Sequence, residues 1–179
     1  MGSVHGDFDL TMDEIRAVVL FAADSAQAVL TDFETDIRDD RRPREALAAA
    51  RDFAQGAPRT NLQRTTATAA HRAAKTASTE TARLAALACG DAAAAAYLHP
   101  IARATQVGHI LRAAACAARV AELKAGDDET VGMSYVAALA QQAAFPLPDV
   151  LRRYPRALQG TSRLSQLMSS LDSAIRDRN

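Results

Sequence analysis

Histidines and one aspartate in alanine-rich segments are the residues of this 179-residue chain whose types are suited to chemistry. His99 and His109 lie at the two ends of the stretch HPIARATQVGH, and His71 and Asp91 lie upstream of it. Imidazole and carboxylate groups bind metal ions and transfer protons. The first question is therefore whether one segment brings enough of these groups together to form a site.

His109 is expected on the buried face of a helix, where a histidine is most often a core residue with one hydrogen-bonded nitrogen. That face carries Thr105, His109, Ala113, Cys116 and Val120. Cys116 is about 10 Å from His109 along the helix axis, which is too far to share an ion. No residue three or four positions after His109 is a metal ligand. A site would have to draw His71, Asp91 or His99 from other helices, so the sequence predicts no metal site and no cofactor.

Gly108 stands in the interior of the same expected helix, where glycine costs about 1 kcal/mol relative to alanine. Its presence predicts the close approach of another helix, or a ligand that needs the space. Ala104 and Ala115 share its side of the helix and extend a strip of small residues. A neighbouring helix can approach along this strip, as can a second copy of the chain in a homodimer.

The charges of the chain balance overall but not locally. Lys plus Arg and Asp plus Glu number 21 each, which argues against nucleic acid and against an anionic membrane as partners. Residues 1–40 hold ten acidic and two basic side chains, whereas residues 41–83 hold nine basic and three acidic ones. These two regions either pair with each other and with water, or form a polar surface for a partner.

Other sequence signals place the chain in the cytoplasm and exclude several classes of protein. Cys89 and Cys116 have no CxxC spacing, and no basic, apolar leader is present, so neither a metal ribbon nor a secretory signal is expected. No apolar run approaches the roughly 20 residues of a membrane span. GxxxxGK[ST], GxSxG and HExxH motifs are absent, and so is a clear basic recognition helix. The sequence gives no positive sign of an enzyme.

Apolar periodicity and capping residues predict helices throughout the chain. Thr11 and Glu14 form a capping box that begins the first helix, and Pro43 is placed as a first-turn proline for the second. His99 precedes Pro100, which predicts a break before a long helix that ends near Gly126. The remaining helices are expected over 60–75, 78–97, 133–144, 148–154 and from 162 onward. We therefore expect a flexible start over 1–8 and one all-α domain over 9–176, with seven or eight helices and an alanine-rich core.

Three segments together resemble a known bacterial family. They are DRRPREALAAARDFAQG (40–56), AAHRAAK (69–75) and AYLHPIARATQVGHILRAAACAARVAEL (96–123). Over about residues 8–175 the chain resembles the Imm-5-like group of immunity proteins. This resemblance implies an all-helical bundle and a toxin-neutralising role. The recurring polar or special positions are Asp40, Arg42, Pro43, Arg44, Arg51, His71, His99, Gly108 and His109.

The leading hypothesis is a cytoplasmic immunity protein that blocks the surface of an unidentified cognate toxin and does no covalent chemistry. Its candidate contacts are Arg42, Arg44, Arg51 and the region from His99 to His109, because arginine anchors suit protein recognition. A structural interpretation stands beside it. In that interpretation the three arginines fix the second helix against the first, through the carboxylates of Asp39, Asp40 and Asp52.

Two other classes of function stay open at this point. One is a bundle that binds a small molecule or a metal, with His71, Tyr97, His99 and His109 lining a cavity between helices. The other is a hydrolase or nuclease, which requires His71, Asp91, His99 and His109 to converge.

Overall fold

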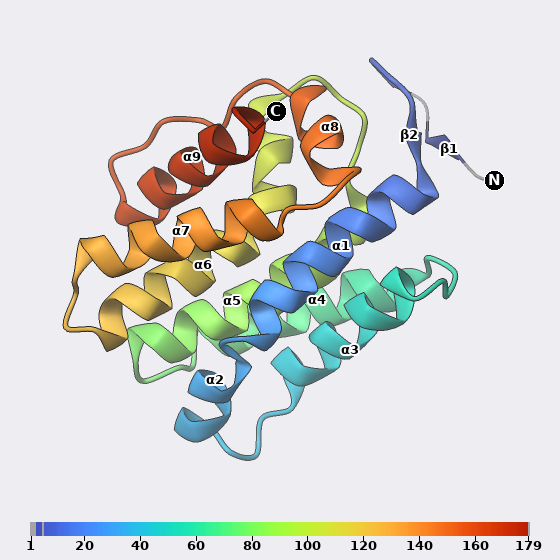
Figure 1. The fold of residues 1–179 in the computed structure, drawn as a ribbon. Helices are drawn as coiled ribbons and strands as arrows, with labels where there is room; N and C mark the ends of the chain where they lie inside the picture. The colour runs from blue at the N-terminus through green and yellow to red at the C-terminus, as the bar shows by residue number, and fades with distance from the viewer. Residues whose placement is uncertain (1–2, 5, 179) are drawn as a thin grey trace.

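In the computed structural model, which describes residues 3–4 and 6–178, nine α-helices make up most of the chain (Figure 1). The helices are α1 (Met12–Gln27), α2 (Leu30–Asp36), α3 (Arg42–Ala54), α4 (Asn61–Ala74), α5 (Glu80–Ala94), α6 (Val107–Lys124), α7 (Glu129–Gln142), α8 (Leu147–Arg152) and α9 (Arg163–Arg176). Two 3-10 turns, η1 (Ala95–Tyr97) and η2 (Ala104–Gln106), connect α5 to α6. The all-α bundle expected from the sequence is confirmed.

Helices α5 and α6 form the centre of the bundle. Helix α5 packs against α1, α2, α3, α4 and α6, and α6 packs against α1, α5, α7 and α9. In Figure 1, α1 crosses in front of α5 and α6, with α3 below it and α7 and α9 above. The groups carried by α5 and α6 therefore lie where most of the other helices meet. No helix among the described residues is both long and apolar enough to cross a membrane.

The core is rich in alanine, as the composition predicts. Helix α5 buries six alanines together with Leu84 and Cys89, and α6 buries five alanines in the run from 113 to 118. Larger buried side chains such as Phe33 and Phe53 come from α2 and α3. Alanine side chains are small, so neighbouring helices can approach closely and leave little room for longer side chains. A polar side chain between these helices needs space that the backbone must provide.

Capping residues explain most of the helix starts. Thr11 and Thr60 form capping boxes, Ser162 caps α9, and Pro43 lies in the first turn of α3. The expected cap at Ser78 is wrong by one residue, because Thr79 caps α5. The backbone N–H and hydroxyl of Ser78 donate instead to the carboxylate of Asp36, a contact that sequence spacing does not reveal. Helix α7 begins at 129, four residues earlier than expected, because Asp128 caps it.

The single helix expected after Thr11 is broken into α1 and α2 at Ala28 and Val29. Val29 has a φ of −120° and a ψ of −4°, outside the helical region. Beyond the break, Val29, Leu30 and Phe33 are all buried, and α2 packs against α5. A continuous helix would turn the adjacent side chains of Val29 and Leu30 about 100° apart. The break allows both to reach the core, and it accounts for the ninth helix.

The start of the chain pairs with the residues just before α1. Strands β1 (Ser3–Val4) and β2 (Leu10–Thr11) are antiparallel, with Val4 opposite Leu10. The sequence predicts no strand, since two residues are too few to show a period of two. Of the segment 1–8 expected to be flexible, residues 1–2 and 5 lie outside the described residues, and this includes His5.

The loop 98–103 separates η1 from η2, so α6 begins well after Pro100 instead of directly behind it. Asp7 contacts this loop twice: its N–H donates to the Pro100 carbonyl (2.8 Å), and its carboxylate accepts from the Ala102 N–H (2.6 Å). The hydroxyl of Tyr154 donates to the His99 carbonyl at 2.9 Å, and Phe8 packs edge-on against the Tyr154 ring. The backbone around His99 is thus held by Asp7 near the start of the chain and by Tyr154 just after α8.

A buried carboxylate joins α6, α7 and α9. Glu122 is fully buried and accepts from Arg119 (2.8 Å) and from the Nε of Arg163 (3.0 Å). A Cβ atom on Gly132 of α7 would lie 2.0 Å from a carboxylate oxygen of Glu122. The glycine therefore provides the space that the buried carboxylate occupies.

Replacing Gly132 by alanine is expected to lower the free energy of unfolding by about 1–3 kcal/mol, the usual cost of overpacking. At an ordinary exposed helix position the same replacement stabilises by about 1 kcal/mol, so the sign of the effect is diagnostic. Urea unfolding measures it. Ser134→Ala, an exposed change in the same helix, serves as the control and should alter stability by less than about 0.5 kcal/mol. A stabilising Gly132→Ala change would contradict the account of Glu122.

Candidate functional site

Asp91 of α5 connects three helices through one carboxylate oxygen. Its side chain is 6% exposed, and Oδ1 lies 3.2 Å from Nε2 of His71 on α4 and 3.5 Å from Nη1 of Arg112 on α6. The other oxygen, Oδ2, is buried and has no hydrogen-bond partner among the described residues. An unpaired buried charge is costly, and the two donors on Oδ1 offset part of that cost. The side chains of His71 and Arg112 are 37% and 42% exposed, so this cluster opens to the surface.

Two glycines provide the space for these donors. A Cβ atom on Gly90 would lie 2.4 Å from Cδ2 of His71, and one on Gly108 would lie 2.4 Å from Nη2 of Arg112. The imidazole thus rests on the backbone of α5 and the guanidinium on the backbone of α6. The sequence-based explanation of Gly108 was a second helix or a ligand, whereas the atoms nearest to the space beside it belong to Arg112, four residues further along the same helix.

His109 and His99 belong to the same region. His109 is half-buried, and burial lowers its pKa below the ordinary histidine value, with Arg112 adding to the decrease. The charge of Asp91 acts in the opposite direction, while His99 and His71 lower the pKa slightly further. His99 itself is exposed at the start of the loop before α6. We group the residues of the Asp91 contacts with the two histidines nearby and call them the Asp91 cluster: His71, Asp91, His99, His109 and Arg112.

The Asp91 cluster consists of polar side chains held in place by one another, and two of them, His71 and Arg112, are partly exposed. Within the described part of the chain, no three His, Cys, Asp or Glu side chains are placed to hold a metal ion. The guanidinium of Arg112 beside Oδ1 also disfavours a second cation there. Cys116 is buried, and burial raises the pKa of its thiol well above the ordinary value, so it stays protonated. In residues 3–4 and 6–178, His71 hydrogen-bonds to Asp91 and to no hydroxyl or thiol that could act as a nucleophile.

Tyr97 lies at the other end of the α4–α5 hairpin. Its hydroxyl donates to the carbonyl of Thr60, and the guanidinium carbons of Arg59 and Arg64 lie 5.5 and 4.6 Å from the centre of its ring. These contacts tie the start of α4 to η1. Cation–π contacts of this kind hold the arginine side chains against the ring.

The three candidate arginines of α3 are each paired with a carboxylate. The pairs are Arg42 with Asp40, Arg44 with Glu34 and Arg51 with Asp24. The first helix expected from the sequence corresponds to α1 and α2, and two of the arginines join α3 to it: Arg51 through Asp24 of α1, and Arg44 through Glu34 of α2. The expected partners are right only for Arg42. Which carboxylate lies opposite an arginine depends on how helices pack, and spacing along the chain does not determine it.

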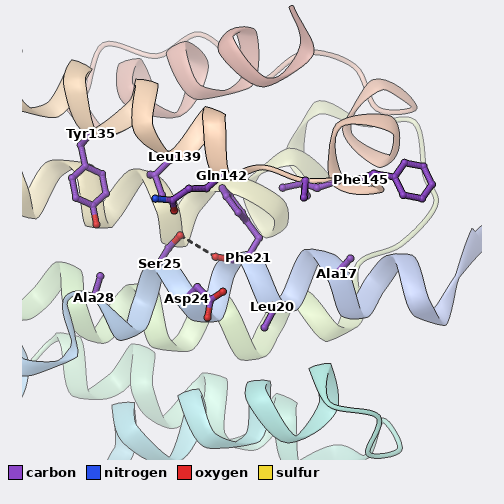
Figure 2. A pocket seen from close by; sticks show the side chains of 12 residues that line it. Ala17, Leu20, Phe21, Asp24, Ser25, Ala28, Tyr135, Leu139, Gln142 and Phe145 are labelled. Atoms are coloured by element: carbon purple, nitrogen blue, oxygen red, sulfur yellow. Dashed lines mark hydrogen bonds between the residues drawn. The ribbon is translucent and has the colours of Figure 1, made fainter. Parts of the chain in front are cut away.

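An apolar groove of about 370 Å³ lies between α1 and α7. Figure 2 shows the side chains that line it. Leu20 and Phe21 of α1 and Tyr135 and Leu139 of α7 are among its lining residues, and the exposed side chain of Phe145 follows the end of α7. None of the lining residues is a histidine. This groove is therefore separate from the cavity that the ligand-binding hypothesis assigns to His71, His99 and His109.

Arg112 and Gly90 are the site residues that sequence reasoning missed. Arg112 follows Gly108 by four positions, a spacing that places the two on one face of a helix. Gly90 and Asp91 interrupt a run that is otherwise almost entirely alanine. A glycine beside a charged residue in such a run indicates that a neighbouring side chain needs space. The pair Gly90 and Asp91 shows this pattern in the sequence itself.

The protein is thus an all-α bundle that carries a polar, ion-paired site. Residues 9–144, well over half of the chain, match the model of the family described as "Imm-5 like putative immunity protein". The chain therefore belongs to this family, and the matched region includes the whole Asp91 cluster. No curated protein and no solved structure matches the chain.

Alanine replacements at the two glycines are expected to have different effects. Gly90→Ala should lower the free energy of unfolding by about 1–3 kcal/mol, because the His71 ring must move and the Ala67 carbonyl lies 3.1 Å from the new Cβ. Gly108→Ala should be close to neutral, because the flexible end of Arg112 can turn into solvent and the gain in helix propensity, about 1 kcal/mol, offsets the weakened contact with Asp91. Thermal unfolding of both variants measures this. Equal effects would contradict the assigned contacts.

His109 should make the protein less stable under mildly acidic conditions. Its pKa is lower in the folded protein than in the unfolded chain, where it is about 6.5. As the pH falls below that value, the unfolded chain therefore binds more protons than the folded one, and stability decreases. Urea unfolding between about pH 7.5 and pH 5 should show a smaller decrease for His109→Gln than for the natural chain. The same decrease in both proteins would contradict this assignment.

Proposed function

We propose that this protein neutralises a cognate bacterial toxin by binding to it and covering the surface that the toxin needs. It acts in the cytoplasm of the cell that makes the toxin and does no covalent chemistry. Family membership over residues 9–144 is the observation that carries the proposal. The open Asp91 cluster supports it, because its partly exposed polar groups are held in place and are presented to a partner.

Arg44 and its neighbours on α3 are the second set of proposed contacts. Arg44 is 60% exposed although it makes two hydrogen bonds to Glu34, at 2.6 and 2.7 Å. A guanidinium fixed in this way loses little side-chain entropy when it binds a carboxylate or carbonyl of a partner. Arg42 and Arg51 are less exposed, at 37% and 31%. Arg44 is therefore the proposed anchor of this set.

The alternative hypothesis, a small-molecule or metal site lined by His71, His99 and His109, stays a prediction. It requires a ligand that copurifies with the protein. Elemental analysis and native mass spectrometry of the purified chain distinguish it from the immunity hypothesis.

Growth rescue tests the proposed function directly. Each toxin-like gene encoded beside this gene in the native genome is expressed alone and together with the chain, and the purified pair is examined by size-exclusion chromatography with light scattering. We expect one toxin that arrests growth, rescue by the chain, and a stoichiometric complex. Rescue without a complex, or no rescue by the natural chain, would contradict neutralisation by binding.

A further inference from the structure

Although the net charge is zero, acidic and basic residues are unevenly distributed among the helices. Residues 53–79, which include α4, contain no Asp or Glu, and neither do residues 92–121, which include most of α6. The first of these segments carries Arg59, Arg64, Arg72 and Lys75, and the second carries Arg103, Arg112 and Arg119. Asp91 lies on α5 between these helices and is buried. The two segments that flank Asp91 therefore carry cations and no carboxylates of their own.

Three basic or histidine side chains follow one side of α4. His71 and Lys75 lie seven and eleven positions after Arg64, which places all three within about 20° of one direction around the helix. This side faces α5, since Arg64 stacks on Tyr97 just beyond α5 and His71 contacts Asp91 within it. On the far side of α5, Arg112 reaches the same Asp91 oxygen. We call Arg64, His71, Lys75 and Arg112, with His109 beside them, the basic strip.

The basic strip combines fixed and free cations. Arg112 is held by Asp91 and rests on Gly108, and Arg64 is held on Tyr97. Lys75 is exposed, and its side chain has no hydrogen bond or ion pair among the described residues. Fixed guanidinium groups lower the entropic cost of binding a carboxylate, and exposed charges accelerate association with a surface of opposite sign.

We propose that the basic strip is the docking surface for an acidic face of the toxin, with Arg64, Lys75 and Arg112 binding its carboxylates. This inference rests on the proposed function and specifies the partner's chemistry. A protein is favoured over nucleic acid because the chain has no net positive charge to attract a polyanion. Asp91 acts as a positioning residue, since it holds His71 and Arg112 without reaching the surface.

Charge reversal tests the docking surface. The double variant Arg64→Glu and Lys75→Glu changes two exposed side chains of the strip. The matched control, Arg152→Glu and Arg156→Glu, makes the same charge change at two exposed arginines of α8 and the segment after it, which lie against α9 and away from α3 and α4. The probe is the toxin identified by growth rescue, and surface plasmon resonance measures its association at two salt concentrations. Thermal unfolding verifies that both variants fold.

The strip variant is expected to associate at least about tenfold more slowly at low salt and to depend less on salt, with the control within about threefold of the natural chain. Gly108→Ala, which keeps every charge but moves Arg112, should weaken binding without loss of stability. If the natural chain binds the toxin and the strip variant stays within about threefold of it, the strip inference fails and the proposed function stands. The strip inference also fails if the control variant associates with the toxin as slowly as the strip variant does. It fails likewise if a short DNA duplex binds the natural chain as tightly as the toxin does. If the natural chain does not bind at all, both fail.

Discussion

A carboxylate buried among closely packed alanine helices must find donors on neighbouring helices, and this requirement organises the structure around Asp91. The side chains next to it on α5 are mostly alanine and offer no donor. His71 and Arg112 reach it from α4 and α6, and they can do so because Gly90 and Gly108 leave the backbone uncovered. The positions of these two donors therefore depend on where glycine interrupts alanine.

The same arrangement recurs where α6 meets α7 and α9. Glu122 is buried, Gly132 provides its space, and Arg119 and Arg163 supply donors. The two sites differ in exposure. Both arginines at Glu122 are less than 20% exposed, whereas His71 and Arg112 are each more than a third exposed. The donors of Glu122 thus lie mostly inside the bundle, whereas those of Asp91 reach the surface.

Local sequence signals predicted the elements better than the contacts between them. Caps at Thr11, Thr60 and Ser162 depend on residues within three positions of one another, so they are visible in the sequence. The break at Val29 lets two adjacent apolar residues both reach the core, and periodicity within one segment does not show this.

Partners across helices were harder to predict. Arg44 and Arg51 bind Glu34 and Asp24, since packing brings these carboxylates opposite them. The histidines were identified as candidates from the sequence. That Asp91 lies at the centre of the cluster could be seen only once α4, α5 and α6 were placed relative to one another. Charge segregation was visible in the opening segments, but only the fold places α4 and α6 on either side of one buried carboxylate.

The central claim is that Asp91 and His71 interact directly across the α4–α5 contact, and a double-mutant cycle tests it most directly. His71→Phe keeps a ring over Gly90 and removes the donor, and Asp91→Asn removes the charge. Urea unfolding of the natural chain, both single variants and the double variant gives the interaction energy. The account predicts a coupling of about 0.5–3 kcal/mol between the two positions. Additive effects, within about 0.3–0.5 kcal/mol, would contradict it.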